Sequence, residues 1–264
     1  FSELETIIGI PKHKGKASEI AEKSITIVKD KNKLLPLKPE KIDSLAHIIL
    51  SLDDGARGYV KSFSSDIQRT HGHVKEIFVN DPISDLGRRD ILNHMEGIDQ
   101  IVISLVVRIR MDKGIASIDS THSLLLADLQ KSKIPMVTFS FGSPYLPSYN
   151  TLETYVCAFG YGSISVTAAA DALWGRRDVN GVLPVDLDST MQRGFGIKKK
   201  RRVKAWGGVN NIEFPNAWWV LDSAIENKIF PGAQVAIVQK GEMVFSAGFG
   251  YHTYDSGSPP VIRE

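Results

Sequence analysis

The sequence predicts an α/β protein: a flavodoxin-like three-layer sandwich with a mostly parallel five-stranded sheet, followed by a truncated α+β segment. First, short apolar runs alternate with segments of helical period from about residue 16 to residue 187, which is the order that a doubly wound sheet requires. Second, most of these runs are apolar at consecutive positions, as expected for strands covered by helices on both faces. Third, only one helical pattern and one hairpin pattern follow, and such a pair cannot bury its own apolar surface.

The first predicted element is a helix over residues 17–28. Five apolar residues recur there at spacings of three and four: Ala17, Ile20, Ala21, Ile25 and Val28. An extended connection over residues 32–37 follows this helix.

Five strands, in the sheet order 2-1-3-4-5, are predicted over residues 48–52, 76–79, 101–107, 135–141 and 154–159. Helices are predicted over residues 56–65, 85–94, 120–131 and 163–174. The last helix is the best defined, because Ser163 can cap its start and Gly175 can end it. Residues 182–185 are predicted as an edge segment, because Pro184 has no N–H to donate to a sheet ladder.

The apolar periodicity disappears from Met191 to Gly208, where glycines and basic residues dominate. We therefore divide the chain into an α/β domain (residues 1–190), a basic linker (191–208) and the start of a second domain (209–264). The second domain is predicted to contain a helix around residues 218–225 and a hairpin around Gly241. The chain begins with Phe1 rather than Met, and we expect it to be a piece of a longer protein.

Composition excludes several classes of protein. Of the 264 residues, 42% are hydrophobic and 23% are charged, which argues against intrinsic disorder. The single cysteine, Cys157, excludes an internal disulfide and a CxxC-type zinc site. No apolar run reaches the length of a membrane-spanning helix, and no signal-peptide pattern opens the sequence.

Positive charge is concentrated in one short cluster within the predicted linker. The formal net charge is +2, but six basic residues fall within seven positions: Lys198, Lys199, Lys200, Arg201, Arg202 and Lys204. The remaining 26 of the 32 basic residues face 30 acidic ones, a net charge of −4. We interpret the cluster as a solvated linker rather than a nucleic-acid patch, because aromatic side chains do not interleave with it.

Candidate functional residues lie at the ends of predicted strands. Asp53 and Asp54 follow the first strand, at the edge where open α/β sheets bind ligands. A phosphoacceptor receiver domain would also need an Asp after the third strand and a Lys after the fifth. Arg108 and the turn at Phe159 occupy those places. The sequence therefore favours a solvated turn at Asp53 over a phosphoacceptor site.

Glycine and histidine patterns also favour structural roles. Gly160 and Gly162 resemble the opening of a dinucleotide-binding loop, but the third glycine position holds Ser165. A tight turn from strand to helix explains them better. His71 and His73 lack a cysteine or a carboxylate at ligand spacing, so a loop is the favoured interpretation.

Nucleophile motifs are absent from the predicted turns. The Gly142-Ser143-Pro144 segment lacks the Gly-x-Ser-x-Gly frame of a hydrolase elbow. Cys157 lies in an apolar strand, where a thiol is expected to be buried and inert.

Two paired motifs resemble the C-terminal α/β domain of glycoside hydrolase family 3. The first is the helix-like stretch 21–30 followed by Leu34-Leu35-Pro36-Leu37, and the second is the Ala-rich stretch 168–175 followed by Asn180-Gly181-Val182-Leu183-Pro184-Val185. The resemblance covers about two thirds of the chain. It implies an accessory domain that packs against a catalytic (β/α)8 barrel and helps to shape the substrate cleft.

The resemblance brings no catalytic residue into this chain. In the hexosaminidase branch of the family, an Asp nucleophile and a His-Asp pair belong to the barrel, whose loop reads Lys-His-x-Pro-Gly-His-Gly. Lys12-His13 is followed by Lys14-Gly15, so it is not that loop. The β-glucosidase branch takes an acid Glu from the α/β domain, but no Glu stands at a predicted strand end here. We therefore predict no catalytic, cofactor-binding or metal-binding residues in this chain.

A second resemblance concerns the end of the chain. Ile229-Phe230-Pro231-Gly232 and the β-rich stretch after it resemble the start of a serine β-lactamase-like domain. Acylation in such domains needs a Ser-x-x-Lys pair, which occurs nowhere in the sequence. Thr26 and Lys29 have this spacing but lie in the other domain, and we assign them no role.

Together the resemblances imply a family 3 β-N-acetylglucosaminidase fused to a β-lactamase-like domain. The partners implied are an upstream barrel and the carbohydrate substrate of the parent, with no nucleic acid and no membrane span. The parent would be an exported bacterial enzyme whose signal lies outside this chain. The alternative from a different class is a flavodoxin-like module that binds a small molecule near Asp53, Arg108 and Gly142, without a glycosidase partner.

Overall fold

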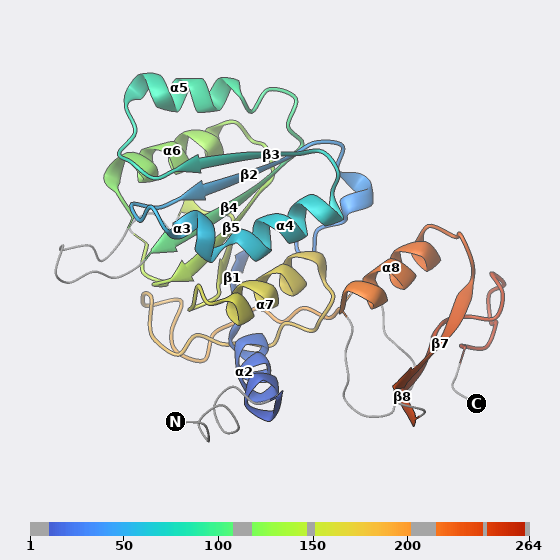
Figure 1. Ribbon diagram of the computed structural model, residues 1–264. Helices are drawn as coiled ribbons and strands as arrows, with labels where there is room; N and C mark the ends of the chain where they lie inside the picture. Colours follow the sequence, from blue (N-terminus) through green and yellow to red (C-terminus); the bar gives the residue numbers. More distant parts are fainter. Residues whose placement is uncertain (1–10, 108–117, 147–150, 202–214, 240–241, 262–264) are drawn as a thin grey trace. The chain divides into compact units, whose positions relative to one another are not determined.

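The computed structural model describes residues 11–107, 118–146, 151–201, 215–239 and 242–261 (Figure 1). The chain divides into two units. The α/β unit comprises Phe1–Trp174 and Val179–Lys199, and the C-terminal unit comprises Gly175–Asp178 and Lys200–Glu264. Within the ranges described, none of the helices has the length and apolar character needed to cross a membrane.

The α/β unit is built on one six-stranded sheet with the order β1-β6-β5-β4-β2-β3. Its strands are β1 Thr26–Asp30, β2 Leu45–Leu50, β3 Val74–Val79, β4 Gln100–Val107, β5 Met136–Gly142 and β6 Thr154–Cys157. All neighbouring pairs are parallel except β1 and β6, which are antiparallel. The five predicted strands therefore occur in the predicted order, and β1 adds a sixth.

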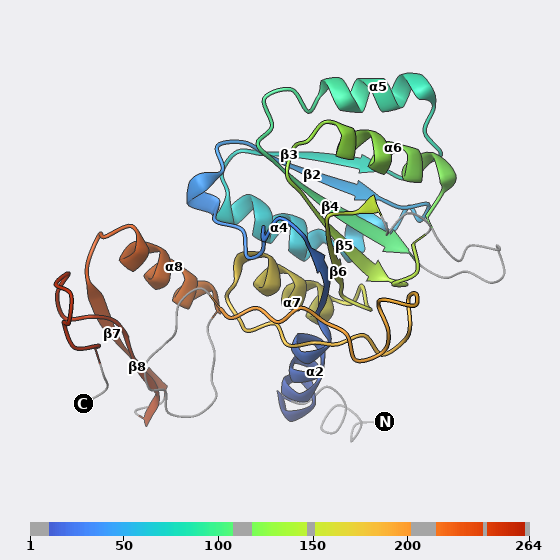
Figure 2. The same cartoon turned by 180° about the vertical axis from the view of Figure 1, so that it is seen from behind.

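Helices cover both faces of the sheet, which makes a three-layer sandwich (Figures 1 and 2). The helices of this unit are α2 Pro11–Ser24, α3 Ala56–Tyr59, α4 Lys61–Thr70, α5 Asp85–Asn93, α6 Ser120–Lys131 and α7 Ser163–Trp174, with a short 3-10 helix at Pro39–Lys41. One apolar cluster joins the sheet to α2, α3, α4 and α7. A second joins the opposite face to α5 and α6.

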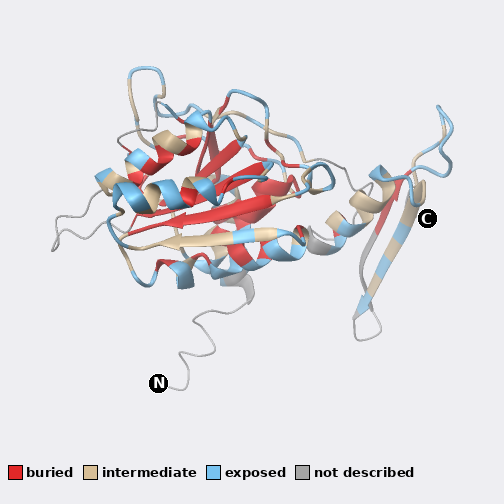
Figure 3. Cartoon of the chain, turned by 90° about the horizontal axis from the view of Figure 1, so that it is seen from above, coloured by how far each residue is buried: buried red, intermediate tan, exposed pale blue. Residues whose placement is uncertain are grey.

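The inner strands of the sheet are buried because both faces pack against helices, as Figure 3 shows, whereas β3 at one edge of the sheet is mostly half-buried. Every residue of β2 and β4 is buried. Alternate residues of β4 point to opposite faces: Val102 and Val106 belong to the cluster of α4 and α7, whereas Ile103 and Leu105 belong to the cluster of α5 and α6. This explains the consecutive apolar residues that predicted the strands.

The prediction of a single helix over residues 17–28 is wrong at its end. The helix stops at Ser24, and Thr26–Asp30 form β1. Ile25, Ile27 and Val28 are all buried, because a strand at this position is covered on both faces. Their β-branched side chains suit a strand, and the backbone of β1 pairs with β6. The helical spacing of Ile25 and Val28 was therefore a coincidence.

Residues 179–199 form a strap along β1, and no strand forms at residues 182–185. Isolated bridges pair Ile197 with Ile27 and Lys199 with Val179. Gly181 approaches the end of α2 so closely that a Cβ there would lie 2.1 Å from the carbonyl oxygen of Ile25. Only glycine allows this approach.

A buried ion pair fixes the end of the strap. The Nζ of Lys199 lies 2.5 Å from the Oδ2 of Asp30, whose side chain has no solvent exposure. The Oδ1 of Asp30 accepts from the backbone N–H groups of Leu34 and Leu35, at 2.8 and 3.4 Å. The carboxylate therefore orders the turn after β1 and anchors the strap at the same time.

The C-terminal unit contains one helix and one hairpin among its described residues. These elements are α8 Pro215–Glu226, β7 Gly232–Gln239 and β8 Glu242–Gly250, and the two strands pair antiparallel. The rings of Trp218 and Phe249 lie 5.1 Å apart and, with Ala247, form its small buried core. The helix and the hairpin agree with the pattern in the sequence. The division into domains and a linker stays a prediction.

Candidate functional site

The carboxyl ends of the parallel strands carry a rigid turn with two carboxylates. After β2, the Ser51 hydroxyl donates to the carbonyl oxygen of Val106 (2.8 Å) and accepts from the N–H of Asp53 (3.1 Å). The Oδ1 of Asp53 accepts from the N–H of Gly55 at 2.9 Å. Ser51 thus ties the turn to β4, and Asp53 closes the turn on itself.

Asp54 connects the turn to the next strand. The Nδ2 of Asn80, which directly follows β3, donates to the Oδ1 of Asp54 at 2.9 Å. Asp54 is exposed and Asp53 is half-buried. Both carboxylates are therefore held by hydrogen bonds at the sheet edge, as the turn interpretation expects. Arg108, the third candidate at this edge, lies outside the described residues.

Two tyrosines gather beside Asp53, and the sequence did not single them out. The rings of Tyr59 in α3 and Tyr161 after β6 lie 5.0 Å apart at an interplanar angle of 34°. A Cβ at Gly55 would be 3.2 Å from both the Oδ1 of Asp53 and the hydroxyl of Tyr59. Asp53, Tyr59 and Tyr161 therefore lie together, and both tyrosines are half-buried.

Gly142 closes the other side of this group. It ends β5 with a φ of +112°, and a Cβ there would lie 2.3 Å from the carbonyl oxygen of Val107 and 3.8 Å from the Cδ1 of Tyr161. The absence of a side chain lets β5 end against β4 and the tyrosine ring. We call Asp53, Tyr59, Gly142 and Tyr161 the edge cluster.

The groups of the edge cluster have the chemistry to contact a polyhydroxylated or aromatic molecule. Partly exposed aromatic faces offer apolar contact, and the carboxylate accepts hydrogen bonds from hydroxyl groups. Within the part of the chain that the structure describes, no group of three or more His, Cys, Asp or Glu residues could hold a metal ion.

The other residues singled out in the sequence are buried in the fold or make contacts within it. The ring nitrogens of His71 contact the carbonyl oxygens of Ile42 (2.7 Å) and His73 (3.1 Å). Cys157 is fully buried in β6, and desolvation raises the pKa of its thiol to about 12. The Thr26 hydroxyl donates to the carbonyl oxygen of Ser24 at 2.9 Å.

Gly160 lies against Ser165, whose Oγ would be 2.9 Å from a Cβ at that position.

A buried histidine forms a polar network that the sequence did not reveal. His47 lies in the middle of β2 with no solvent exposure. Its Nε2 is 2.8 Å from the Ser104 hydroxyl, and its Nδ1 is 3.2 Å from the Ser64 hydroxyl. Desolvation lowers the pKa of His47 to about 4, although the Glu76 carboxylate, 3.9 Å away, opposes this shift. The imidazole is therefore neutral at neutral pH, and its role is to form hydrogen bonds inside the core.

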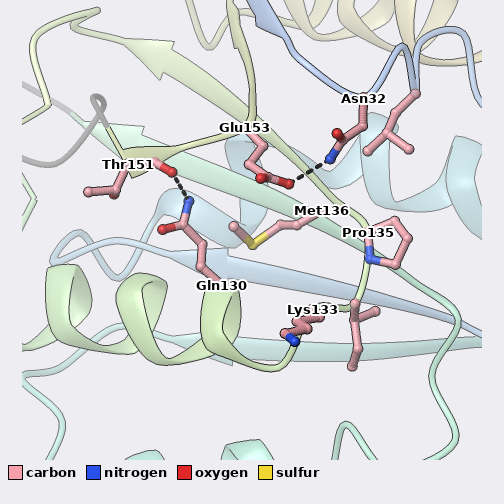
Figure 4. Close-up of a pocket in the computed structure, with 9 residues that line it drawn as sticks. Asn32, Gln130, Lys133, Pro135, Met136, Thr151 and Glu153 are labelled. Carbon is pink, nitrogen blue, oxygen red and sulfur yellow. Dashed lines mark hydrogen bonds between the residues drawn. The ribbon is translucent and has the colours of Figure 1, made fainter.

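A pocket of about 570 Å³ lies at the opposite edge of the sheet (Figure 4). Its walls come from the turn after β1, from the end of α6 with the start of β5, and from the residues before β6. Asn32 donates to the Oε2 of Glu153 at 2.6 Å, and the Nε2 of Gln130 donates to the carbonyl oxygen of Thr151 at 2.5 Å. The two bonds link three segments of the pocket wall.

Solved structures with a similar fold include carbohydrate-active enzymes. The β-glucoside phosphorylase BglX gives a TM-score of 0.55 at 25% identity, covering 68% of this chain and 32% of that chain. A glycoside hydrolase family 3 β-N-acetylglucosaminidase from Paenibacillus gives a TM-score of 0.51 at 17% identity, covering 68% and 34%. A fungal multi-domain family 3 β-N-acetylglucosaminidase gives a TM-score of 0.54 at 14% identity, covering 90% and 30%.

The chain spans about a third of the length of these three proteins. The two β-N-acetylglucosaminidases are below 25% identity, so their likeness concerns the fold alone. No protein-family model matches the sequence, and no curated protein matches it. The chain therefore shares its fold with part of family 3 glycoside hydrolases.

Proposed function

We propose that the α/β unit is the accessory C-terminal domain of a family 3-like glycoside hydrolase and that the bond-breaking residues lie on a (β/α)8 barrel elsewhere in the parent protein. The observation that carries the proposal is the sheet. Its five parallel strands have the order β3-β2-β4-β5-β6, and solved enzymes of this family share the fold over 68% to 90% of the chain.

The edge cluster is the part of the unit that would face the substrate. Carboxyl ends of parallel strands are where open α/β sheets bind ligands. Tyr59 and Tyr161 offer partly exposed rings, and Asp53 offers a fixed carboxylate. These groups would bind a sugar and orient it. Hydrolysis with retention would need a pair of carboxyl groups on either side of the glycosidic bond, and the proposal places that pair on the barrel.

The proposal extends to the parent enzyme. Its reaction would be hydrolysis of the O-glycosyl bond of a β-N-acetylglucosaminide in an exported bacterial protein. A β-lactamase-like domain would begin within residues 209–264, where Pro231 and Gly232 lead into β7. Two of the structural neighbours are β-N-acetylglucosaminidases, which is the support for this substrate, whereas others are a β-glucoside phosphorylase and a β-glucosidase.

Turnover of a nitrophenyl β-N-acetylglucosaminide tests the proposal. We expect the 264-residue chain alone to show no turnover and the protein encoded by the complete gene to hydrolyse the substrate. In that complete protein, Tyr161→Ala should raise KM about fivefold while kcat changes less, since loss of one stacking contact costs about 1 kcal/mol. Leu86→Ala, in an exposed side chain of α5, is the control. Turnover by the purified chain alone would contradict the proposal.

The second candidate is a small-molecule-binding module without a glycosidase partner. The edge cluster also supports this candidate, because a carboxylate and two aromatic rings converge there. A complete gene that encodes no barrel, together with a ligand-induced rise in Tm abolished by Asp53→Ala, would favour this candidate.

A further inference from the structure

The pocket at the amino ends of β5 and β6 lies at the opposite edge of the sheet from the edge cluster. The parallel strands β2 to β6 end at the edge cluster, whereas β5 and β6 begin at the pocket, where antiparallel β1 ends. The pocket is therefore separate from the place where the fold usually binds ligands. The inference drawn from it does not depend on the function proposed for the other edge.

Planar polar side chains line one side of the pocket. Glu153 and Asn32 lie together in the wall, and Gln130 reaches across from α6 toward Thr151 (Figure 4). Each amide uses its NH₂ group in a bond to the wall, so its carbonyl oxygen can accept from a ligand. The wall thus offers a carboxylate and two carboxamides, all fixed by hydrogen bonds to neighbouring segments.

The floor of the pocket is apolar. Met136 is buried at the start of β5, and Leu34 and Ile134 are half-buried beside it. An apolar floor with polar groups along one side suits a ligand that has C–H groups on one face and hydroxyl groups at its rim.

The charges around the pocket favour a neutral ligand. Glu153 disfavours an anion at the polar wall, and its Oε1 already lies 3.8 Å from the Nζ of Lys31. Lys133, at the opposite side in Figure 4, disfavours a cation. Hydrogen bonds from neutral hydroxyl groups to a carboxylate are stronger than bonds between two neutral groups, so a neutral polyol gains from Glu153 without a charge penalty.

We propose that this pocket binds a neutral polyhydroxylated molecule of the size of a mono- or disaccharide, held by Glu153, Asn32 and Gln130 over the Met136 floor. Its volume of about 570 Å³ falls within the usual range of small-molecule sites. Its open, exposed rim predicts weak binding, with a Kd of about 1 mM.

A titration of the 264-residue chain with cellobiose, followed through its backbone amide resonances, tests the proposal. We expect saturable shifts at residues 31–34, 130–136 and 151–153. Glu153→Ala should weaken binding about tenfold or more, because it removes a hydrogen bond to a charged group. Gln130→Ala is a second variant that leaves the Glu153 pair intact and should also raise the Kd severalfold.

Lys131→Ala provides the matched control, because Lys131 is exposed beside Gln130 and pairs with Asp128 outside the pocket lining. Its Kd should equal that of the unmodified chain. Glycylglycine and phosphate are the comparison probes for a zwitterion and an anion. Saturation with either of these but not with cellobiose, shifts confined to residues 51–59, or no saturation at all would each overturn the proposal.

Discussion

Gly142 occupies a place where a side chain would meet the backbone of the neighbouring strand. Its φ is +112°, and a Cβ would lie 2.3 Å from the carbonyl oxygen of Val107. We expect Gly142→Ala to lower the free energy of unfolding by about 3 kcal/mol, because strain in φ and a clash with β4 add together. Denaturation in urea, followed by the circular dichroism of the α/β unit, measures this change.

Gly97→Ala separates the two causes. Gly97 also has a positive φ, +76°, but no atom lies within 4 Å of a Cβ there. Its substitution should cost only about 1 kcal/mol. Equal losses in the two variants would show that the contact with Val107 contributes nothing.

His47 should make the stability of the α/β unit depend on pH. Burial lowers its pKa from 6.5 to about 4, so the unfolded chain binds the proton more tightly than the folded chain. Stability from this group is complete above about pH 6.5 and is lost as the pH falls toward 4, by up to about 3 kcal/mol. Urea denaturation between these pH values measures the slope.

A variant of His47 identifies the group responsible. His47→Gln keeps a side chain that can bond to Ser64 or Ser104 but cannot take up a proton in this range. Its stability should be lower at pH 7 and should vary less between pH 6.5 and 4. An unchanged slope would assign the pH dependence to other groups.

Residues that directly follow a predicted strand could be singled out from the sequence. Residues that are far apart in the sequence and come together only in the fold were missed. Asp53 and Asp54 were found because they directly follow an apolar run. Tyr59 and Tyr161 form the edge cluster only when β2 and β6 end at the same side of the sheet. Neither tyrosine carries a local signal, because a lone aromatic residue after a strand is equally compatible with core packing.

The strap along β1 depends on one buried ion pair. Lys199→Met leaves the unexposed carboxylate of Asp30 without its cation, and we expect a loss of about 2 kcal/mol, since an unpaired buried charge is costly and Lys199 is itself partly exposed. Hydrogen exchange of the β1 amides should report the loss. The adjacent Lys200 pairs with Asp178 at 2.9 Å but is 75% exposed, so Lys200→Met should change stability by about 0.5 kcal/mol or less.

If Lys199→Met and Lys200→Met lowered the free energy of unfolding by similar amounts, the strap would be stabilised by the charge of the basic cluster as a whole. The pair itself could not be predicted from sequence. Asp30 and Lys199 are far apart in the chain, and the cluster that contains Lys199 is typical of a solvated surface.

Whole elements were predictable where one kind of periodicity dominates. Helices α6 and α7 occupy the expected residues, Ser120–Lys131 and Ser163–Trp174. The strand β1 was missed because it directly follows helix α2. Its apolar residues continue the helical spacing, so the two elements were predicted as one helix. Ile25 and Val28 fit the helical stripe as well as they fit a strand buried on both faces. Only pairing with β6 decides between the two.

At the scale of the molecule, the two units differ greatly in the apolar core they contain. The α/β unit buries two large clusters on the faces of its sheet. Among the described residues of the C-terminal unit, the buried cluster consists of Trp218, Ala247 and Phe249. A helix and a two-stranded hairpin with so small a core are at the limit of independent stability in water.

This difference predicts two separate levels of hydrogen-exchange protection in the intact chain. The slowest amides of β2 and β4 should exchange only on global unfolding of the α/β unit. Those of β7 and β8 should exchange through a local opening that has a much lower free energy. We expect the two sets to differ by at least about 100-fold, or about 3 kcal/mol. The pairing of β7 with β8 has a register irregularity between Ile237 and Val238, whereas the pairings of β2 and β4 have none, so equal protection in both units could not come from hydrogen-bond geometry. It would instead require that the C-terminal unit folds cooperatively with the α/β unit, contrary to the small core it contains.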